Sequence, residues 1–132
     1  MDRITQIEDS IEYAKRRIAR SEKVLKLYDD PVFNEIVVKN YFEQEAIRMV
    51  SLYGSGSGSE EQLRDLEKDM HAIGAFRRYL SQIVQEGRQA QSDLAMNQEA
   101  LEEELAIQAE ARANGEEPAL PFDADYNGNL GA

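Results

Sequence analysis

The chain has 132 residues, which suits one domain of ordinary size, and its alanine, glutamate, glutamine and leucine content predicts an almost entirely α-helical protein. It has no cysteine, which excludes disulfides, thiolate zinc sites and cysteine nucleophiles, and it shows neither a secretory signal nor an apolar run near the roughly 20 residues of a membrane span. The net charge of −11 argues against a general nucleic-acid coat, because neutralising phosphates requires a basic surface.

The first predicted helix runs from about Asp2 to Tyr28, with Asp2 as its N-cap. Apolar or small residues recur along it at alternating steps of three and four, which is the spacing of a coiled-coil seam. The seam positions are Ile4, Ile7, Ile11, Ala14, Ile18, Ser21, Leu25 and Tyr28. The pattern predicts packing against another helix, either within the chain or in a second copy.

The same helix carries a basic face, although the chain as a whole is acidic. Residues 1–28 hold seven basic and five acidic side chains, whereas residues 59–132 hold six and sixteen. The basic face consists of Lys15, Arg16, Arg17, Arg20, Lys23 and Lys26. It can dock an acidic partner or nucleic acid, or it can be a solvated face balanced by acidic residues of a neighbouring helix.

The second predicted helix runs from about Val32 to Tyr53 and is the most apolar stretch of the chain. Asp30 is the predicted N-cap and Pro31 the first helical residue, so a short turn joins the first two helices into an antiparallel hairpin. Apolar residues cover more than one face, which predicts burial on two sides, by other helices of the chain or by a partner. Tyr41, Phe42 and Tyr53 fit core packing or an exposed aromatic patch.

Residues 54–59, of sequence GSGSGS, form a flexible linker by composition, natural or engineered. Ser59 and Gln62 make a capping box, so the third predicted helix begins there and continues to Ala113. At about 1.5 Å per residue it would be a rod of about 80 Å. Its apolar stripe is dense over residues 60–95, the bundle part. The stripe thins over 96–113, which we expect to project from the bundle.

Residues 114–132 are predicted to form an irregular acidic arm, because Asn114-Gly115 ends the helix and prolines and glycines follow. Asp123 to Gly128 match the first half of an EF-hand loop, but the acidic ligand at position 12 would fall beyond the last residue, so a turn is the favoured interpretation. Six apolar residues on the projecting helix and the arm are the candidate partner-binding residues. They are Leu94, Leu101, Leu105, Phe122, Tyr126 and Leu130.

No residue pattern indicates catalysis, a metal site or a cofactor site. His71 is the single histidine and has no second histidine or carboxylate at the spacing of zinc proteases. The acidic run Glu102 to Glu104 lacks the histidine of a di-iron helix motif. We therefore predict that the protein is not an enzyme and needs no cofactor.

These readings combine into an all-α fold in which an antiparallel hairpin packs on a long third helix and an extended C-terminal arm follows. The predicted divisions are a hairpin at 1–53, a linker at 54–59, a long helix at 60–113 and an arm at 114–132.

Two stretches resemble a family of small helical proteins encoded among the virion genes of tailed bacteriophages. They are LYDDPVFNEIVVKNYFEQEAIRMVSLYG at 27–54 and DMHAIGAFRRYLSQIVQEGRQAQ at 69–91. The shared pattern is an aspartate/proline turn, a phenylalanine, a Y-F-x-x-E-A-x-R-x-V stretch and an A-I-G-x-x-R-x-Y-L stretch. The resemblance covers about half of the chain, and the linker and the arm lie outside it.

The resemblance implies a multi-copy virion component that binds a larger capsid, portal or tail protein and associates with itself. Such a protein would be found in the virion, and in the host cytoplasm during assembly. Two alternatives stay open from the residues alone. One is a scaffold or assembly chaperone, suggested by the acidity and length of the third helix. The other is an oligomer like the small terminase, which would contact nucleic acid through the basic face.

Overall fold

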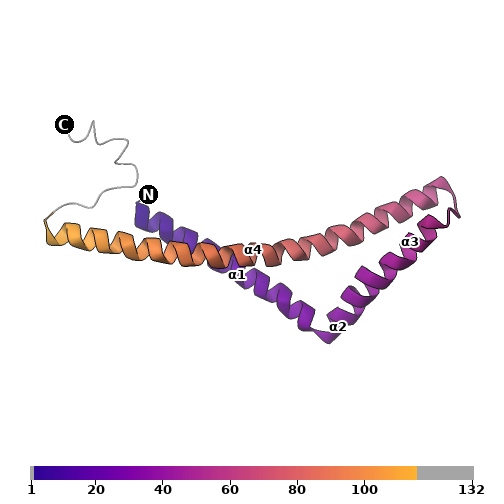
Figure 1. The fold of residues 1–132 in the computed structure, drawn as a ribbon, viewed down its shortest axis with the longest axis horizontal. Helices are drawn as coiled ribbons and strands as arrows, with labels where there is room; N and C mark the ends of the chain where they lie inside the picture. Colours follow the sequence, from indigo (N-terminus) through magenta and orange to yellow (C-terminus); the bar gives the residue numbers. More distant parts are fainter. Residues whose placement is uncertain (1, 116–132) are drawn as a thin grey trace. The chain divides into compact units, whose positions relative to one another are not determined.

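The computed structural model of the chain describes residues 2–115, and every element in this range is helical (Figure 1). The elements are α1 (Arg3–Asp29), α2 (Pro31–Phe33), η1 (Asn34–Glu45), α3 (Ala46–Gly54) and α4 (Glu60–Ala113). The all-α prediction is confirmed. Residues 116–132, which hold most of the predicted arm, lie outside the described residues.

Two of the helix starts follow the local chemistry that the sequence predicts. The Asp2 carboxylate accepts a hydrogen bond from the Thr5 N–H at 2.7 Å, which lowers the pKa of Asp2. Asp30 Oδ1 accepts from the N–H groups of Val32 and Phe33 at 2.9 and 3.0 Å, with Pro31 at the first helical position. The N-cap predictions at α1 and α2 are therefore confirmed.

The start of α4 is closed by a reciprocal pair of hydrogen bonds. The Ser59 N–H donates to Gln62 Oε1 at 2.9 Å, and the Gln62 N–H donates to Ser59 Oγ at 3.1 Å. This is the predicted capping box. Gly58 precedes the capping box and has a φ of +117°, which residues with a Cβ rarely adopt. A glycine at this position therefore lets the linker turn into the start of α4.

Pro31 to Gly54 form the second helical segment, in which η1 lies between α2 and α3. Its extent agrees with the helix predicted over 32–53, but η1 is a π-helix of 12 residues. The residues of this segment that belong to or pack on the apolar cluster are Phe33, Val37, Val38, Phe42, Ala46 and Met49. The steps of five from Phe33 to Val38 and from Val37 to Phe42 match π-helical bonding, which joins residues five apart. The β-branched run Ile36 to Val38 lies within η1, and such residues lower α-helix propensity slightly.

The inward row of α1 departs from the predicted seam near the end of the helix. Ile7, Ile11 and Ala14 are buried as predicted, but the row then passes through Val24, and Leu25 is exposed. Val24 is buried in one apolar cluster with Phe42, Met49 and Ile73, and Tyr28 packs against that cluster. These neighbours decide which side of α1 is buried near its end, so the prediction of Leu25 as a seam residue is wrong.

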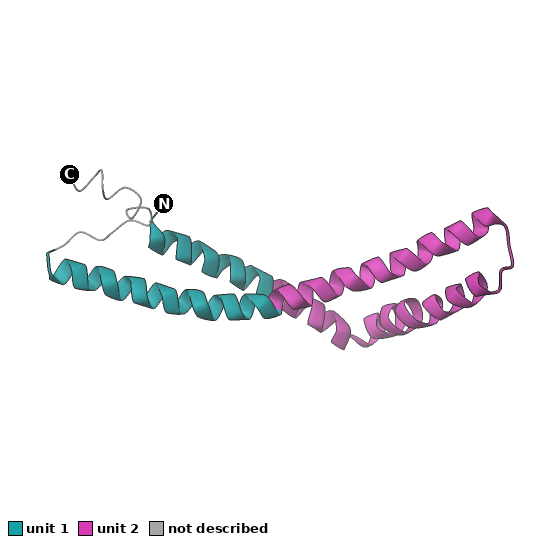
Figure 2. Cartoon of the chain, turned by 45° about the horizontal axis from the view of Figure 1, so that its top comes forward, with its two compact units in different colours: residues 1–18, 88–132 teal, residues 19–87 magenta. Residues whose placement is uncertain are grey.

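The chain forms two compact units, which divide α1 and α4 near their middles (Figure 2). Unit 1 comprises residues 1–18 and 88–132, and unit 2 comprises residues 19–87. Unit 1 pairs the start of α1 with the second half of α4. The stretch 96–113, expected to project, thus shares a unit with α1, and Arg3 Nε lies 3.2 Å from Glu104 Oε2. The core of unit 1 consists of Ile7, Ile11, Ala14 and Ala90.

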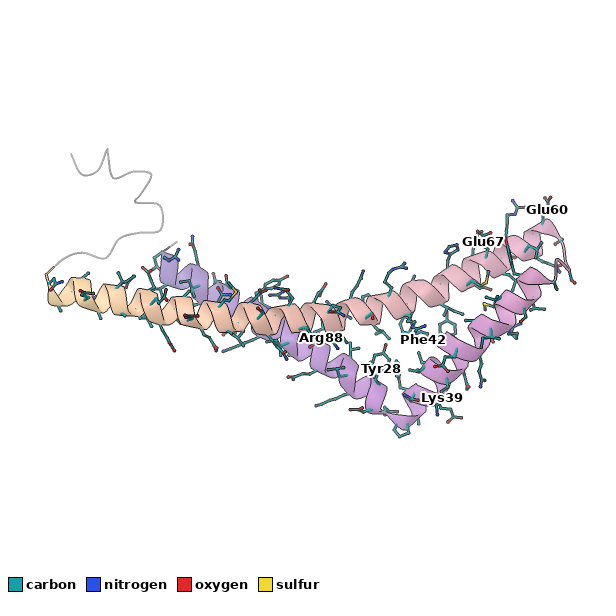
Figure 3. All side chains as sticks on the ribbon, viewed as in Figure 1. Tyr28, Lys39, Phe42, Glu60, Glu67 and Arg88 are labelled. Atoms are coloured by element: carbon teal, nitrogen blue, oxygen red, sulfur yellow. The ribbon has the colours of Figure 1, made fainter. Side chains whose placement is uncertain are left out.

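Unit 2 is built around one apolar cluster supplied by all of its helical segments. The buried members are Val24, Phe42, Met49, Ile73, Leu80 and Ile83. Phe42 extends from η1 toward α4, where its ring centroid lies 5.5 Å from that of Phe76 (Figure 3). Tyr28 and Phe33 meet edge to face at 5.8 Å beside the turn between α1 and α2. The cluster fixes which side of the second helical segment faces inward.

Gly74 lies on an exposed face of α4, and no atom lies within 4 Å of the position that a Cβ would take. Glycine inside a helix costs about 0.5–1 kcal/mol relative to alanine. Gly74→Ala should therefore raise the free energy of unfolding by about that amount, measured from urea denaturation. Gly58→Ala is the contrasting variant. It should destabilise the protein, because a Cβ there would lie 2.8 Å from Gln62 Oε1 at a positive φ. An unchanged or lower stability of Gly74→Ala would contradict this account.

Candidate interaction surface

The second helical segment exposes large apolar side chains on the sides that do not face the cluster. The rest of unit 2 covers the second helical segment only in part. Large apolar side chains therefore remain on the surface of a strongly charged chain. The exposed large apolar residues of α2, η1 and α3 are Val32, Ile36, Tyr41, Ile47, Val50, Leu52 and Tyr53. Apolar side chains gathered on one element are typical of a binding surface.

One part of this surface is a shallow groove along η1 with a volume of about 320 Å³. Its lining residues are Ile36, Asn40, Tyr41, Glu45 and Met49, and we call it the η1 groove. Glu45 forms an ion pair with Arg48, which lowers the pKa of Glu45 and keeps it charged at the rim. The groove thus has an apolar floor with polar groups at its edge, the usual makeup of a site for a partner side chain.

The other part lies on α3, where Ile47 and Val50 are three residues apart and point away from the cluster. Ile47 is 66% exposed and Val50 is 59% exposed. Ser51 and Gly54 lie on the same side of the helix, since steps of three and four return to one face. We call these four residues the α3 patch.

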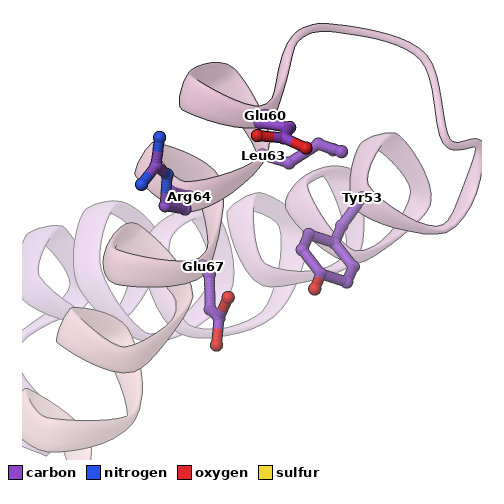
Figure 4. A pocket seen from close by; sticks show the side chains of 5 residues that line it. All are labelled: Tyr53, Glu60, Leu63, Arg64 and Glu67. Carbon is purple, nitrogen blue, oxygen red and sulfur yellow. The ribbon is translucent and has the colours of Figure 1, made fainter.

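A second pocket of about 270 Å³ lies where the end of α3 approaches the start of α4 (Figure 4). Tyr53 lines it from α3, and Glu60, Leu63, Arg64 and Glu67 line it from α4. Two carboxylates, one guanidinium and one phenol can hold polar groups. They do not form a nucleophile and base pair.

In unit 1, Arg17 of the basic face is bound to its own chain. Arg17 Nη2 donates to Asp93 Oδ2 at 2.7 Å, and the guanidinium carbon lies 4.5 Å from the centre of the Tyr13 ring. The pKa of Asp93 is lowered by the hydrogen bond from Arg17 and, to a smaller degree, by the one from Gln89. Arg17 therefore joins α1 to α4 within the unit.

In unit 2, Arg20 makes comparable contacts. Arg20 Nη2 donates to the Tyr79 hydroxyl at 2.9 Å, and Nη1 lies 4.0 Å from Glu86 Oε2. Of the other members of the face, Lys15 pairs with Glu12 at 3.6 Å, and Arg16, Lys23 and Lys26 are exposed. Two of the six cations are thus held against α4, which favours the interpretation of the basic face as one balanced by a neighbouring helix.

The predicted partner-binding residues divide into three groups. Leu94 and Leu101 are half-buried in unit 1, and Leu105 is exposed on α4. Phe122, Tyr126 and Leu130 lie outside the described residues, as do Asp123 to Gly128. Of the three predicted residues within 2–115, Leu105 alone is exposed, so a partner could contact it without any change in the fold.

The described residues hold no group of three or more histidine, aspartate or glutamate side chains that could bind a metal ion. His71 is exposed and lies 3.9 Å from Glu67 on the same helix. Within residues 2–115, no helix is both long enough and apolar enough to cross a membrane.

The sequence matches no protein-family model, and neither a curated protein nor a solved structure shows significant similarity to it.

The exposed residues Ile36, Ile47 and Val50 were not among the predicted partner-binding residues. The signal for them was present, because the second predicted helix has apolar residues on more than one face. The spacing of apolar residues does not show whether an apolar face is buried by the same chain or left exposed for a partner. The spacing also assumed α-helical winding, whereas the π-helical winding of η1 decides which residues share a face.

Proposed function

We propose that this chain is a non-catalytic structural protein, present in several copies in the particle of a tailed bacteriophage, that binds a larger capsid, portal or tail protein. Binding uses the helices of unit 2 and the C-terminal arm, residues 116–132. The observation that carries the proposal is the apolar η1 groove on the surface of a chain with net charge −11. The phage setting rests on the resemblance of residues 27–54 and 69–91.

The residues of that resemblance give the proposal further support. Tyr41 and Glu45 line the η1 groove, whereas Phe42 and Ile73 belong to the cluster that holds η1 against α4. The two stretches that carry the resemblance thus supply residues of both the groove and the cluster behind it. A side chain fully buried on binding contributes about 1.5–3 kcal/mol, so Ile36 and Tyr41 together can anchor a partner of moderate affinity.

Replacing Ile36 with glutamate tests the role of the η1 groove. Ile36 is more than half exposed, so the free chain tolerates the change, but a partner would have to desolvate the carboxylate. We expect incorporation of a tagged chain into assembling particles to fall at least about tenfold, the equivalent of about 1.4 kcal/mol. Quantitative mass spectrometry of purified particles measures this. Met96→Glu, at an exposed apolar position in unit 1, is the matched control and should be incorporated normally.

The outcomes separate the possible roles. Absence of the unaltered chain from mature particles, together with its presence in immature ones, would instead favour a scaffold or assembly chaperone. Unchanged incorporation of Ile36→Glu would exclude the η1 groove as the binding site. A chain that lacks 116–132 should also be lost from particles, and normal incorporation of that chain would remove the arm from the proposal.

A further inference from the structure

We infer that the α3 patch is the contact between two copies of this chain, with two α3 helices packed antiparallel across a two-fold axis. The inference extends the multi-copy part of the proposed function and uses a surface distinct from the η1 groove. It names a second copy as the partner of Ile47 and Val50, whose side chains have no cover within unit 2.

The shape of the patch is complementary to itself. Ile47 and Val50 protrude, whereas Ser51 and Gly54 are small and follow on the same side of the helix. The space beside Gly54 is open, with no atom within 4 Å of where a Cβ would be. A two-fold axis between residues 50 and 51 would place Ile47 over Gly54 of the second copy and Val50 over Ser51 of the second copy. A two-fold contact requires this kind of match, in which each protrusion meets a recess of the same surface.

The near absence of charge on the patch is compatible with a second copy as the partner and argues against a partner selected by charge. α3 carries a single charged side chain, Arg48, which pairs with Glu45 of its own chain. A nucleic acid or a partner selected by charge therefore has nothing to recognise on the patch. Unit 2 has nine basic and twelve acidic residues, whereas unit 1 has six and fourteen. The unit that carries α3 thus has the smaller net negative charge, which limits the repulsion between two copies of that unit.

Glycine at position 54 provides a test that separates shape from apolarity. The φ of Gly54 is not positive, and no atom lies near its Cβ position, so Gly54→Leu fits the single chain. The leucine adds apolar surface but fills the recess that receives Ile47. Non-specific association through apolar surface would make the leucine variant associate more tightly. Packing across the proposed axis would make it associate less tightly.

The experiment measures mass by light scattering or sedimentation over a series of concentrations. We expect the unaltered chain to approach twice its mass of 15.0 kDa as concentration rises. Ile47→Glu and Gly54→Leu should each require at least about tenfold higher concentration for the same shift. Met96→Glu should behave as the unaltered chain, because residue 96 is 67% exposed, like Ile47, but belongs to unit 1. Circular dichroism confirms that each variant is folded.

Two results would overturn the inference. One is a mass of 15.0 kDa at every concentration up to the solubility limit, and the other is a Gly54→Leu variant that associates as well as the unaltered chain. The proposed function has a separate readout. A chain that stays monomeric yet enters particles through the η1 groove contradicts the copy contact alone. A chain that dimerises through α3 but never enters particles contradicts the proposed function alone.

Discussion

Phe42→Ala should lower the free energy of unfolding of unit 2 by about 3–5 kcal/mol. Phe42 is 5% exposed, and it is the aromatic member of the buried cluster that joins η1 and α3 to α1 and α4. Its loss removes the contact with Phe76 and opens a cavity that the surrounding helices can fill only in part. Small domains have total stabilities of about 5–15 kcal/mol, so the variant should bring unit 2 close to unfolding.

Urea denaturation followed by circular dichroism measures this effect, and tyrosine fluorescence is a second probe because the chain has six tyrosines and no tryptophan. Two compact units can unfold in separate steps, so the change should fall on one step. Hydrogen exchange should show faster exchange in η1 and α3 and little change in residues 3–18.

Tyr41→Ala is the matched control, because Tyr41 is the neighbouring aromatic residue but is 36% exposed. Its cost should be clearly smaller, since Tyr41 does not belong to the buried cluster and is more exposed than Phe42. Equal costs for the two variants would show that the cluster does not depend on Phe42 in the way the structure implies.

The parts of the fold that depend on residues close in sequence could be predicted. Asp30 caps α2 and Ser59 caps α4. Each cap is a hydrogen bond between one side chain and a backbone N–H two or three residues further along the chain, so it can be predicted from the sequence. The helical character of residues 3–54 and 60–113 follows in the same way from spacing and from the positions of the prolines. These features depend on residues close in sequence, so the local sequence is enough to predict them.

The parts that depend on pairing between distant segments could not be predicted. The thin stripe of Leu94, Leu101 and Leu105 suggested a projecting helix, because spacing shows that a stripe exists but not what covers it. In the structure the start of α1 shares unit 1 with this stretch of α4, and Arg17 and Asp93 are 76 residues apart in sequence. The η1 groove was missed for a related reason, since its residues share a face only in a π-helix.

Ala90→Leu should lower the stability of unit 1 by about 1–3 kcal/mol, because it adds volume where two helices already meet closely. Ala14 on α1 and Ala90 on α4 have 0% exposed surface. Each helix of the antiparallel pair in unit 1 thus completely buries a side chain no larger than a methyl group. Because Ala90 is fully enclosed, the larger leucine side chain is expected to push the helices apart or to take a strained rotamer.

Ala95→Leu is the matched control for this last prediction, on the same helix and in the same unit. Residue 95 is exposed, and alanine and leucine are both strong helix formers, so its effect should stay within about 0.5 kcal/mol. Urea denaturation of both variants gives the comparison. A second variant, Ala14→Gly with Ala90→Leu, should recover part of the lost stability if the two alanines face each other, after allowance for the helix cost of glycine. No recovery beyond the sum of the single changes would place the tight contact elsewhere along α1.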